Sequence, residues 1–342
     1  MKHKILVTGG TGYIGSHTVV ELQQAGYDVV IIDNLSNSNI GVLDGIEKIT
    51  GIRPEFVEGD VTDMATLRKL FEEHPGIEGI INFAASKAVG ESVQKPLLYY
   101  RNNLVSLMNL LQLMPEFGTK GIVFSSSCTV YGEPDKNPID ESAPIKPATS
   151  PYGNTKQISE EIITDYIKSG APIKSILLRY FNPVGAHPSA EIGELPLGVP
   201  QNLVPYLTQA AAGIRKELTV FGNDYNTPDG SCIRDYIDVV DLAKAHVIAM
   251  KRMLDMPETE SVEIFNLGTG RGLSVLELIE SFERATGVKV PHKIGARREG
   301  DIEKIWADPK KANNVLGWKA EAPIDDTMRN AWAWQCKCAE KK

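Results

Sequence analysis

A tyrosine and a lysine lie four residues apart in SPYGNTKQ, as Tyr152 and Lys156. Residues at this spacing share one face of a helix, about one turn apart. Ser150 followed by Pro151 is typical of a helix start, so Tyr152 is expected in the first turn. A tyrosine titrates near pH 10, and a base working near pH 7 needs its pKa lowered by roughly 3 units, about 4 kcal/mol. A neighbouring ammonium group favours the phenolate, so the pair can accept a proton.

Ser127 adds a hydroxyl to this pair. It follows an apolar β-rich run in SSSCTVYG, so it is expected at a strand end beside the start of the Tyr152 helix. Oxidation of a carbinol carbon requires a base within hydrogen-bond reach of the hydroxyl proton. We predict Tyr152 as that base, Lys156 as its cation, and Ser127 as the group that orients the substrate hydroxyl or relays its proton. A Tyr-x-x-x-Lys pair also arises about once by chance in such a chain, and the alternative is an amphipathic pair on a helix surface.

TGGTGYIG, residues 8–15, indicates a dinucleotide site. Its glycines Gly9, Gly12 and Gly15 follow the first β-rich run and open the first helical segment. Glycine lets the backbone turn tightly and approach a pyrophosphate, whose charge the N–H groups of the helix start can hold. A glycine triplet alone also fits an ordinary strand–helix turn, so the decision depends on its context.

Asp33 supplies that context. It ends the second β-rich run, eighteen residues after Gly15, where a carboxylate can accept hydrogen bonds from the adenosine ribose. A carboxylate would repel a 2′-phosphate, and no arginine follows before Arg53, so we predict NAD rather than NADP. The oxidised nicotinamide is a second positive charge that favours the Tyr152 phenolate, and Lys156 can hydrogen-bond its ribose. Further cofactor contacts are expected at the carboxyl ends of the strands. They are Tyr13, Ile14, Asn34, Asp60, Val61, Phe83, Ala84 and Ala85.

The elements that must position these residues alternate regularly. Short β-rich runs are separated by segments of helical periodicity, and the runs are apolar throughout, as expected of strands covered on both faces. We predict an α/β fold with a Rossmann-type, doubly wound parallel sheet. The runs are residues 4–10, 28–33, 54–61, 79–85, 121–127 and 174–181.

This alternation ends near residue 182. A loop rich in proline and glycine, residues 182–202, precedes shorter helices and strands, and loops of that length in compact domains are usually functional. We predict an NAD-binding domain over residues 1–182 and a smaller α/β substrate domain over 183–342. Part of residues 236–262 is expected to pack back on the first domain.

Composition limits the partners. The 342 residues carry a net charge of −8 and no long basic run, which speaks against nucleic acid or an anionic membrane as the main partner. No apolar run reaches the roughly 18 residues that a membrane span needs, and no signal-peptide pattern is seen. The four cysteines lack paired zinc spacing and the six histidines are scattered, so no metal site is predicted. We expect a cytoplasmic protein with reduced thiols that acts on a small molecule.

Longer motifs identify a resemblance. The chain resembles the extended short-chain dehydrogenase/reductase family over nearly its whole length, and within it the nucleotide-sugar epimerases. Tyr-x-x-x-Lys marks only the superfamily, whereas RYFNPVGAHPS and RREGD are more discriminating. The stretches that carry the resemblance are VTGGTGYIGSHT (7–18), DNLSNS (33–38), KAVGESVQKPLLYYRNN (87–103), FSSSCTVYG (124–132), SPYGNTK (150–156), LLRYFNPVGAHPS (177–189), FGNDYNTPDG (221–230), RDYIDVVDLA (234–243) and RREGD (297–301).

The resemblance implies an isomerase of galactose metabolism that interconverts UDP-glucose and UDP-galactose. The sugar 4-hydroxyl would lose its proton to Tyr152 and its hydride to a tightly held NAD. The 4-keto sugar then rotates, and the hydride returns to the opposite face, while UDP stays anchored. The resemblance also implies a homodimer formed through helices in residues 87–116 and 152–169.

The resemblance assigns further residues by position. Lys87, Asn102 and Tyr180 would contact the cofactor, with Tyr180 near the nicotinamide. Guanidinium groups suit a diphosphate because they make forked, charge-assisted hydrogen bonds, and aromatic rings can pack on uracil or its ribose. The residues implied to hold UDP and the sugar are Lys87, Ser127, Tyr152, Asn182, Asn202, Leu203, Phe221, Arg234, Tyr236, Arg298, Asp301 and Ile305. The alternative for Asp301 is an ion pair with Arg297 or Arg298.

Three positions depart from the family pattern. Cys128 occupies a small-residue position after Ser127, where packing is its expected role. Asp238 stands where relatives often carry a histidine. Ile305 falls where the family varies between a bulky aromatic and a small residue, so weaker activity on UDP-GlcNAc and UDP-GalNAc is expected.

Other functions share much of this pattern. A nucleotide-sugar 4,6-dehydratase has the same fold and Tyr/Lys pair but adds an acid–base Asp-Glu pair after the catalytic hydroxyl, where this chain has Cys128 and Thr129. A UDP-glucuronate epimerase or decarboxylase needs groups for a 6-carboxylate that are not evident. A non-catalytic dinucleotide sensor has no need for Ser127, Tyr152 and Lys156.

Overall fold

A seven-stranded parallel sheet forms the centre of the protein in this computed structural model, which describes residues 3–255, 261–298 and 301–340. Every neighbouring pair of its strands is parallel, which confirms the predicted doubly wound α/β fold. The strand order reverses between β1 and β4, which is where doubly wound sheets bind their ligands. In order across the sheet, the strands are β11 (Val262–Leu267), β6 (Lys174–Tyr180), β5 (Gly121–Ser125), β4 (Ile77–Asn82), β1 (Lys4–Thr8), β2 (Asp28–Asp33) and β3 (Glu55–Glu58).

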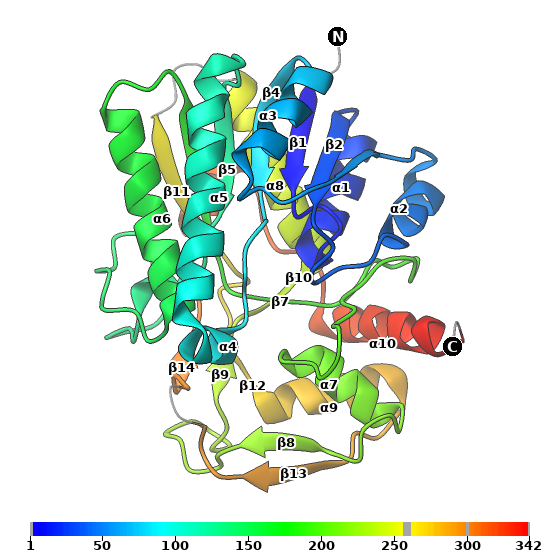
Figure 1. Ribbon diagram of the computed structural model, residues 1–342. Coiled ribbons are helices and arrows are strands. Elements are labelled where there is room, and N and C mark those ends of the chain that lie inside the picture. The colour runs from blue at the N-terminus through cyan, green and yellow to red at the C-terminus, as the bar shows by residue number, and fades with distance from the viewer. Residues whose placement is uncertain (1–2, 256–260, 299–300, 341–342) are drawn as a thin grey trace.

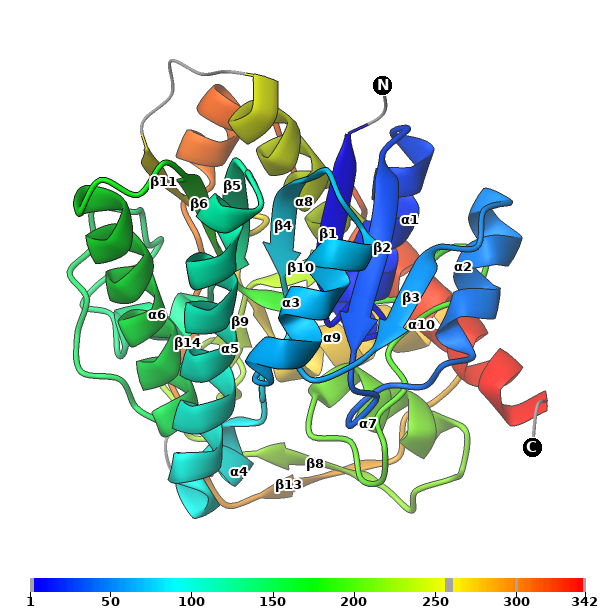
Figure 2. The same ribbon diagram turned by 45° about the horizontal axis from the view of Figure 1, so that its top comes forward.

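Helices cover both faces of this sheet, which is why its strands are apolar on both sides (Figures 1 and 2). One cluster of buried side chains, including Leu107 and Ile163, joins the sheet to three helices, and a second cluster, including Val20 and Ala249, joins it to three others. The first group is α3 (Met64–Glu73), α5 (Pro96–Glu116) and α6 (Pro151–Lys168). The second group is α1 (Tyr13–Gln24), α2 (Val42–Thr50) and α8 (Val239–Asp255).

Two late segments lie in this layered part of the molecule. Helix α8 packs beside α1 and against the sheet, and β11 pairs with β6 along its whole length. Helix α8 lies within the 236–262 segment that was expected to pack back, whereas β11 overlaps it only at Val262, so its place in the large sheet was not predicted. Residues 256–260 lie outside the described part of the chain. Residues 299–300 of the RREGD motif and the last two residues lie outside it as well.

Smaller elements gather below the carboxyl ends of the large sheet (Figure 1). Their own core contains Leu207, Phe282 and Met328. The helices are α7 (Leu203–Ala211), α9 (Val275–Thr286) and α10 (Ile324–Glu340). The strands pair as β7 (Asn182–Val184) with β10 (Tyr236–Asp238), β8 (Leu218–Phe221) with β13 (His292–Gly295), and β9 (Ile233–Arg234) with both β12 (Leu273–Ser274) and β14 (Lys304–Ile305). Helix α4 (Val89–Gln94), the 3₁₀ turn η1 (Cys128–Tyr131) and the π-helical turn η2 (Ala312–Leu316) complete the elements.

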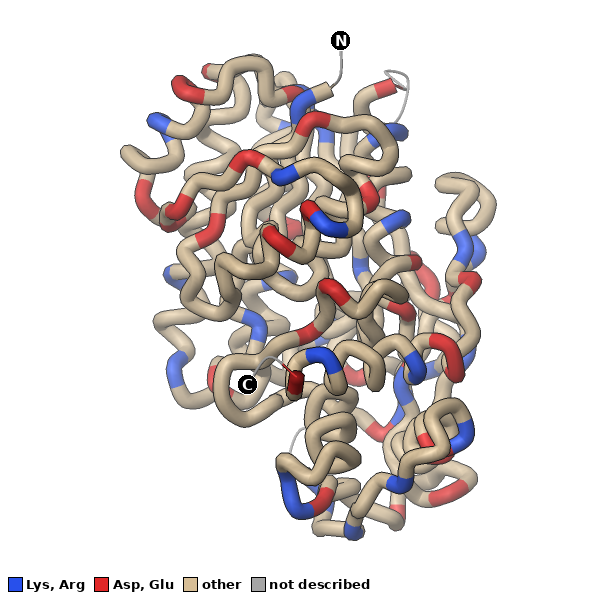
Figure 3. Tube along the Cα trace, turned by 90° about the vertical axis from the view of Figure 1, so that its right-hand side faces the viewer, with Lys and Arg blue, Asp and Glu red and all other residues tan. Residues whose placement is uncertain are grey.

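Charged residues of both signs are intermixed along the trace in Figure 3. In the described part of the chain, no helix combines the length and the apolar character needed to cross a bilayer.

Candidate active site

The start of α6 places Tyr152 and Lys156 below the end of β5. Ser150 caps the helix by accepting a hydrogen bond from Gly153 N at 3.1 Å, and Pro151 takes the first helical position, where no N–H is needed. The predicted helix start is therefore confirmed at residue 151. Tyr152 lies in the first turn, and Lys156 follows one turn later on the same face.

Ser127 and Tyr152 meet at this edge. Ser127 is buried, has extended backbone, and caps η1 by accepting from Thr129 N at 3.2 Å. Burial raises the pKa of Tyr152, the neighbouring Tyr180 and Cys128 raise it further, and a hydrogen bond with Ser127 lowers it. The net direction is opposite to the lowering that proton abstraction requires. Positive charge from Lys156 and from the oxidised nicotinamide inferred from the sequence would act against this effect of burial.

Lys156 is held in a buried position. Its Nζ donates to the backbone O of Ser125 at 2.6 Å and lies 5.8 Å from the centre of the Tyr152 ring. Burial lowers its pKa to about 8, while the charge of Glu160 acts in the opposite direction. Tyr180, at the end of β6, is also buried, and its hydroxyl is hydrogen-bonded to Ser125 Oγ. Side chains from two strand ends, β5 and β6, and from the start of α6 therefore meet around Tyr152.

The β1–α1 turn has the shape of a dinucleotide cradle. Gly9 has a φ of +70°, which favours glycine, and a Cβ on Gly15 would lie 2.3 Å from Gly9 O. Gly12 precedes α1 directly, so the amides of Tyr13, Ile14 and Gly15 are first-turn N–H groups without partners inside the helix. The tight backbone and these donors fit a pyrophosphate.

Asp33 and Asp60 lie at the next two strand ends with their carboxylates fixed. Asp33 accepts from Thr11 N at 3.2 Å and from Leu35 N at 2.9 Å, which directs its oxygens toward the β1–α1 turn. Asp60 accepts from the backbone and the hydroxyl of Thr62 at 2.8 and 2.7 Å. Asn34 donates to Asp60 at 3.1 Å, and Val61 is buried beneath them. These groups suit an adenosine.

The remaining cofactor candidates lie in the segment after β4 or, in the case of Asn102, on α5. Phe83 and Ala84 follow β4 directly, and a Cβ on Gly9 would lie 2.9 Å from Ala84 N. Ala85 is exposed. Lys87 lies 3.6 Å from Glu194 and not at the strand ends. Asn102 Nδ2 donates to Ser86 Oγ at 3.1 Å, beside the chain segment that carries Ala85.

Tyr13, a predicted cofactor contact, also joins two segments of the chain. Its Oη donates to Gly185 O at 2.8 Å, so its side chain connects α1 to the start of the 182–202 loop. Its backbone N–H lies in the first turn of α1.

Two arginines converge on one carboxylate in the smaller part of the molecule. Arg298 forms an ion pair with Asp301 at 2.6 Å, and Arg234 Nη2 lies 3.9 Å from the same carboxylate. The alternative weighed for Asp301, an ion pair with Arg298, is therefore present. Phe221 is exposed at the end of β8, with the Arg298 guanidinium 5.5 Å from its ring centre. Two arginines and one aspartate leave one net positive charge beside an aromatic face.

Other residues assigned to the nucleotide and sugar lie around this group. Asn182 begins β7, next to Tyr236 in β10, and Tyr236 is buried. Leu203 begins α7, and Asn202 before it donates to Glu194 at 2.6 Å. Glu194 thus contacts both Asn202 and Lys87, which were both predicted to hold UDP and the sugar, Lys87 being a predicted cofactor contact as well.

Ile305 is fully enclosed in β14, opposite Arg234 in β9. It belongs to an apolar cluster that includes Phe181 and Val130, and Cys128 packs on this cluster. Burial raises the pKa of the Cys128 thiol to about 12, so it remains neutral and acts as packing. The side chains that pack together on one side of Ser127 are therefore apolar.

Asp238, which departs from the family pattern, has a structural contact. Its carboxylate accepts from Val240 N at 2.8 Å at the start of α8, and from Thr327 Oγ1 at 2.8 Å. It therefore joins the start of α8 to α10.

Some side chains around the site were missed by the sequence analysis. Glu160 continues the Tyr152–Lys156 spacing by one more turn, a signal that was available. His246 gave no such signal: its ring lies 4.8 Å from Phe83 and 6.0 Å from Tyr180, and only the folding of α8 onto the sheet brings it there.

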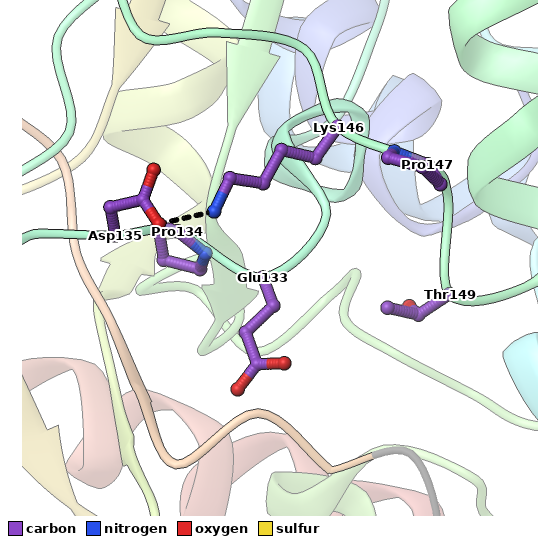
Figure 4. A pocket seen from close by; sticks show the side chains of 6 residues that line it. All are labelled: Glu133, Pro134, Asp135, Lys146, Pro147 and Thr149. Carbon is purple, nitrogen blue, oxygen red and sulfur yellow. Dashed lines mark hydrogen bonds and ion pairs between the residues drawn. The ribbon is translucent and has the colours of Figure 1, made fainter.

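Two open hollows lie outside this group. One, of about 570 Å³, borders the 133–149 loop, where Lys146 pairs with Asp135 at 2.5 Å (Figure 4). The other, of about 410 Å³, lies between that loop and the start of α6, near Tyr100 and Asn154. Ser127, Tyr152 and Lys156 line neither of them. Among the described residues, no cluster of three or more metal-ligating side chains was found.

Known proteins share this architecture over almost the whole chain. A family model described as GDP-mannose 4,6 dehydratase matches residues 6–331. UDP-glucose 4-epimerase 2 of Arabidopsis thaliana is 50% identical over 337 residues, which cover 98% of this chain and 95% of that protein. The solved UDP-glucose 4-epimerase of Stenotrophomonas maltophila, with bound NAD and formylated UDP-arabinopyranose, has a TM-score of 0.95 at 47% identity and covers 99% of this chain and 100% of its own. The enzyme of Bifidobacterium longum, in complex with NAD+ and UDP, has a TM-score of 0.94 at 47% identity, with the same coverage.

Proposed function

The chain belongs to the UDP-glucose 4-epimerases of the extended short-chain dehydrogenase/reductase family, and we propose from this premise that Ser127, Tyr152 and Lys156 carry out its proton transfer. Its activity is the NAD-dependent interconversion of UDP-glucose and UDP-galactose. The observation that carries the residue assignment is the meeting of these three side chains at the end of β5, beside the glycine cradle.

The proposed chemistry divides among these residues. NAD, when bound, would supply the acceptor and donor for the hydride of sugar C4. Tyr152 takes the proton of the 4-hydroxyl and later gives one back, and Ser127 orients that hydroxyl through its contact with Tyr152. Lys156 supplies positive charge beside the phenolate from its fixed position on Ser125 O. Because burial works against ionisation, both positive charges would favour the ionised form of this base.

The two nucleotides, NAD and UDP, are assigned to two separate groups of residues. The glycine turn, with Gly9, Gly12 and Gly15, would hold the pyrophosphate of NAD, and Asp33 its adenosine ribose. Arg234 and Arg298 would hold the diphosphate of UDP, and Phe221 its base or ribose. In this proposal Asp301 keeps the two guanidinium groups together until the ligand diphosphate binds between them.

A dehydratase reaction is disfavoured, although the matching family model carries that name. Elimination of water from the 4-keto sugar needs an acid–base pair beside the catalytic hydroxyl. Here the two following residues are Cys128, whose thiol stays neutral, and Thr129, which has no titratable group. The proposed reaction therefore consists of hydride transfer and return, with no elimination of water.

The proposal also covers UDP-sugars that carry an acetamido group. Ile305 is smaller than the aromatic residue seen in some relatives, but it is β-branched and stiff at χ1, so it cannot swing aside freely. We expect efficient exchange of UDP-glucose and UDP-galactose and weaker exchange of UDP-GlcNAc and UDP-GalNAc.

A homodimer through α5 and α6 is also proposed. The outer side of α4 and α5 exposes large apolar side chains, with Val93 63% and Leu97 82% exposed, and an unpartnered apolar face of this kind favours association. Sedimentation of the wild type as a dimer and of Leu97→Asp as a monomer is expected; a monomeric wild type would refute the dimer.

Location and domain division complete the proposal. The thiols of Cys128, Cys232 and Cys336 are outside any disulfide, which suits the reducing cytoplasm. The division is an NAD-binding domain over 1–182, joined by part of 236–262, and a UDP-sugar domain over 183–342. The contacts of α8 with the large sheet support the return of part of 236–262, and the pairing of β11 with β6 extends that return to residue 267.

The assay for this function uses UDP-galactose and the purified protein without added cofactor. UDP-glucose should accumulate to a constant ratio, and denatured protein should release NAD. An unreacted substrate, a 4-keto-6-deoxy product, or a requirement for NADP would each overturn the assignment.

A further inference from the structure

Glu160 is a buried carboxylate that lies behind the proposed proton-transfer site. It follows Lys156 by one helical turn and Tyr152 by two, so the three side chains share one face of α6. A buried carboxylate is costly unless it is paired and hydrogen-bonded. The proton transfer described above does not use it directly, so its burial needs another reason.

The Glu160 carboxylate is held from two strand ends. Ser126 Oγ donates to its Oε1 at 2.5 Å, and Arg179 binds both oxygens, Nε to Oε1 at 2.9 Å and Nη2 to Oε2 at 2.5 Å. Arg179 Nη1 also donates to Tyr131 Oη at 2.9 Å, which donates to Asn266 Oδ1 at 2.7 Å. The network therefore joins α6 to β5, β6, η1 and β11.

Each partner of Glu160 adjoins a residue of the site. Ser126 directly precedes Ser127, and Arg179 directly precedes Tyr180. Tyr131 ends the 3₁₀ turn that Ser127 caps. A shift of the Glu160 carboxylate would thus move the serine, the tyrosines and the helix that carries Lys156 relative to one another.

Glu160 is also the carboxylate whose charge acts on Lys156. Burial lowers the pKa of Lys156 to about 8, and the charge of Glu160 opposes that lowering. Arg179 forms the ion pair behind Glu160, on the side away from the base. The titratable and charged side chains around Lys156 and Tyr152 are Glu160 on α6, Cys128 on η1, Tyr180 and Arg179 on β6, and Tyr99 on α5.

We propose that Glu160 is a positioning residue for the proton transfer: held by Ser126 and Arg179, it fixes α6, and with it Lys156, against the ends of β5 and β6. This inference rests on the proposed roles of Tyr152 and Lys156.

The sign of the effect on pH dependence follows from the charges. Without the carboxylate, the pKa of Lys156 falls further below its ordinary value, and the lysine becomes neutral at a lower pH. A neutral Lys156 no longer favours the Tyr152 phenolate. The fall of kcat on the alkaline side should therefore move to lower pH.

The test compares pH profiles of kcat for UDP-galactose in Glu160→Gln and in Glu161→Gln, whose glutamate is the exposed neighbour. In Glu160→Gln the alkaline limb of the profile should move down by about one pH unit. At a pH well above the Lys156 pKa of both the variant and the wild type, kcat should be about tenfold lower in the variant. Glu161→Gln should match the wild type. Glu160→Asp, which keeps the charge, should restore the limb toward its original position, and all variants should keep their NAD.

Loss of the buried ion pair could prevent Glu160→Gln from folding, because Arg179 would lose its counter-charge. The double variant Glu160→Gln/Arg179→Met removes both charges and should show a smaller shift in the same direction, because loss of the Arg179 charge favours protonation of Lys156. A folded variant whose profile superimposes on the wild type overturns the inference, even if its Tm is lower. Absence of epimerisation in the wild type and in Glu161→Gln would instead overturn the proposed function.

Discussion

The proton-transfer end and the diphosphate end of the candidate site differ in how their polar groups are partnered. Around Tyr152, the side chains are buried and already bonded within the protein: Lys156 is 5% exposed and bound to Ser125 O, and Ser127 is 7% exposed and caps η1. At the other end, Arg298 is 58% exposed, and its main partner, Asp301, is a carboxylate whose place a ligand phosphate can take.

This difference matches what each end must do. A base that is opposed by burial needs charges in fixed places, because a group that rotates freely supplies little stabilisation of the transition state. A diphosphate site must open and close with each substrate, so guanidinium groups on an exchangeable partner are suitable. Substitutions at the buried end should therefore change kcat, and those at the exposed end should change binding.

The largest effect is expected at Tyr152. Tyr152→Phe keeps the ring and removes the proton acceptor, so kcat should fall by about 10²–10⁴-fold, the usual contribution of general acid–base catalysis. The Kd of UDP, measured by calorimetry, should stay near the wild-type value because the arginines are untouched. Near-normal turnover in this variant would remove Tyr152 from the mechanism, and a parallel loss of UDP binding would show that the two ends are not separate.

An intermediate effect is expected at Ile305, which lies in the apolar cluster beside Cys128. The measured quantity is the ratio of kcat/KM for UDP-GalNAc to that for UDP-galactose. Ile305→Ala should raise it and Ile305→Tyr should lower it, each by about 10–200-fold, because steric fit alone discriminates by about 1–3 kcal/mol. An equal ratio in all three proteins would mean that residue 305 does not limit the sugar pocket. Circular dichroism of Ile305→Tyr checks that the larger ring is accommodated.

The smallest effects are expected at the arginines. Arg234→Ala should weaken UDP binding by about 10–100-fold, as expected for one charge-assisted hydrogen bond, with kcat little changed. Arg298→Ala should weaken it less, because solvent screens the more exposed charge. Arg297→Ala is the matched control: its guanidinium pairs with Asp224 and packs on Tyr225, so UDP affinity should be unaffected. Equal losses in all three variants would point to a general charge effect and not to a built diphosphate site.

Local patterns were enough to predict much of this structure. The apolar strands, the glycine turn and the Ser150-Pro151 helix start each depend on neighbours in sequence, and each lies where it was expected. The predicted strand–helix alternation is confirmed by the order of the parallel sheet.

Contacts between distant segments were harder to foresee. The pairing of Glu160 with Arg179 depends on how α6 settles on β6, and the approach of His246 to Phe83 depends on the return of α8 to the sheet. The direction of the Tyr152 pKa was also not available from the sequence, because desolvation is a property of the folded surroundings. The residues that carry the proposed chemistry could therefore be predicted from the sequence. The neighbouring groups that fix their positions or change their pKa values could not.

The central claim, oxidation and reduction at one carbon without net redox, is tested most directly with UDP-galactose that carries deuterium at C4. The wild type in ordinary water should give UDP-glucose with the deuterium still at C4, because the hydride leaves and returns within one site. Deuterium lost to solvent, or found at C6 of a 4-keto-6-deoxy sugar, would contradict the account.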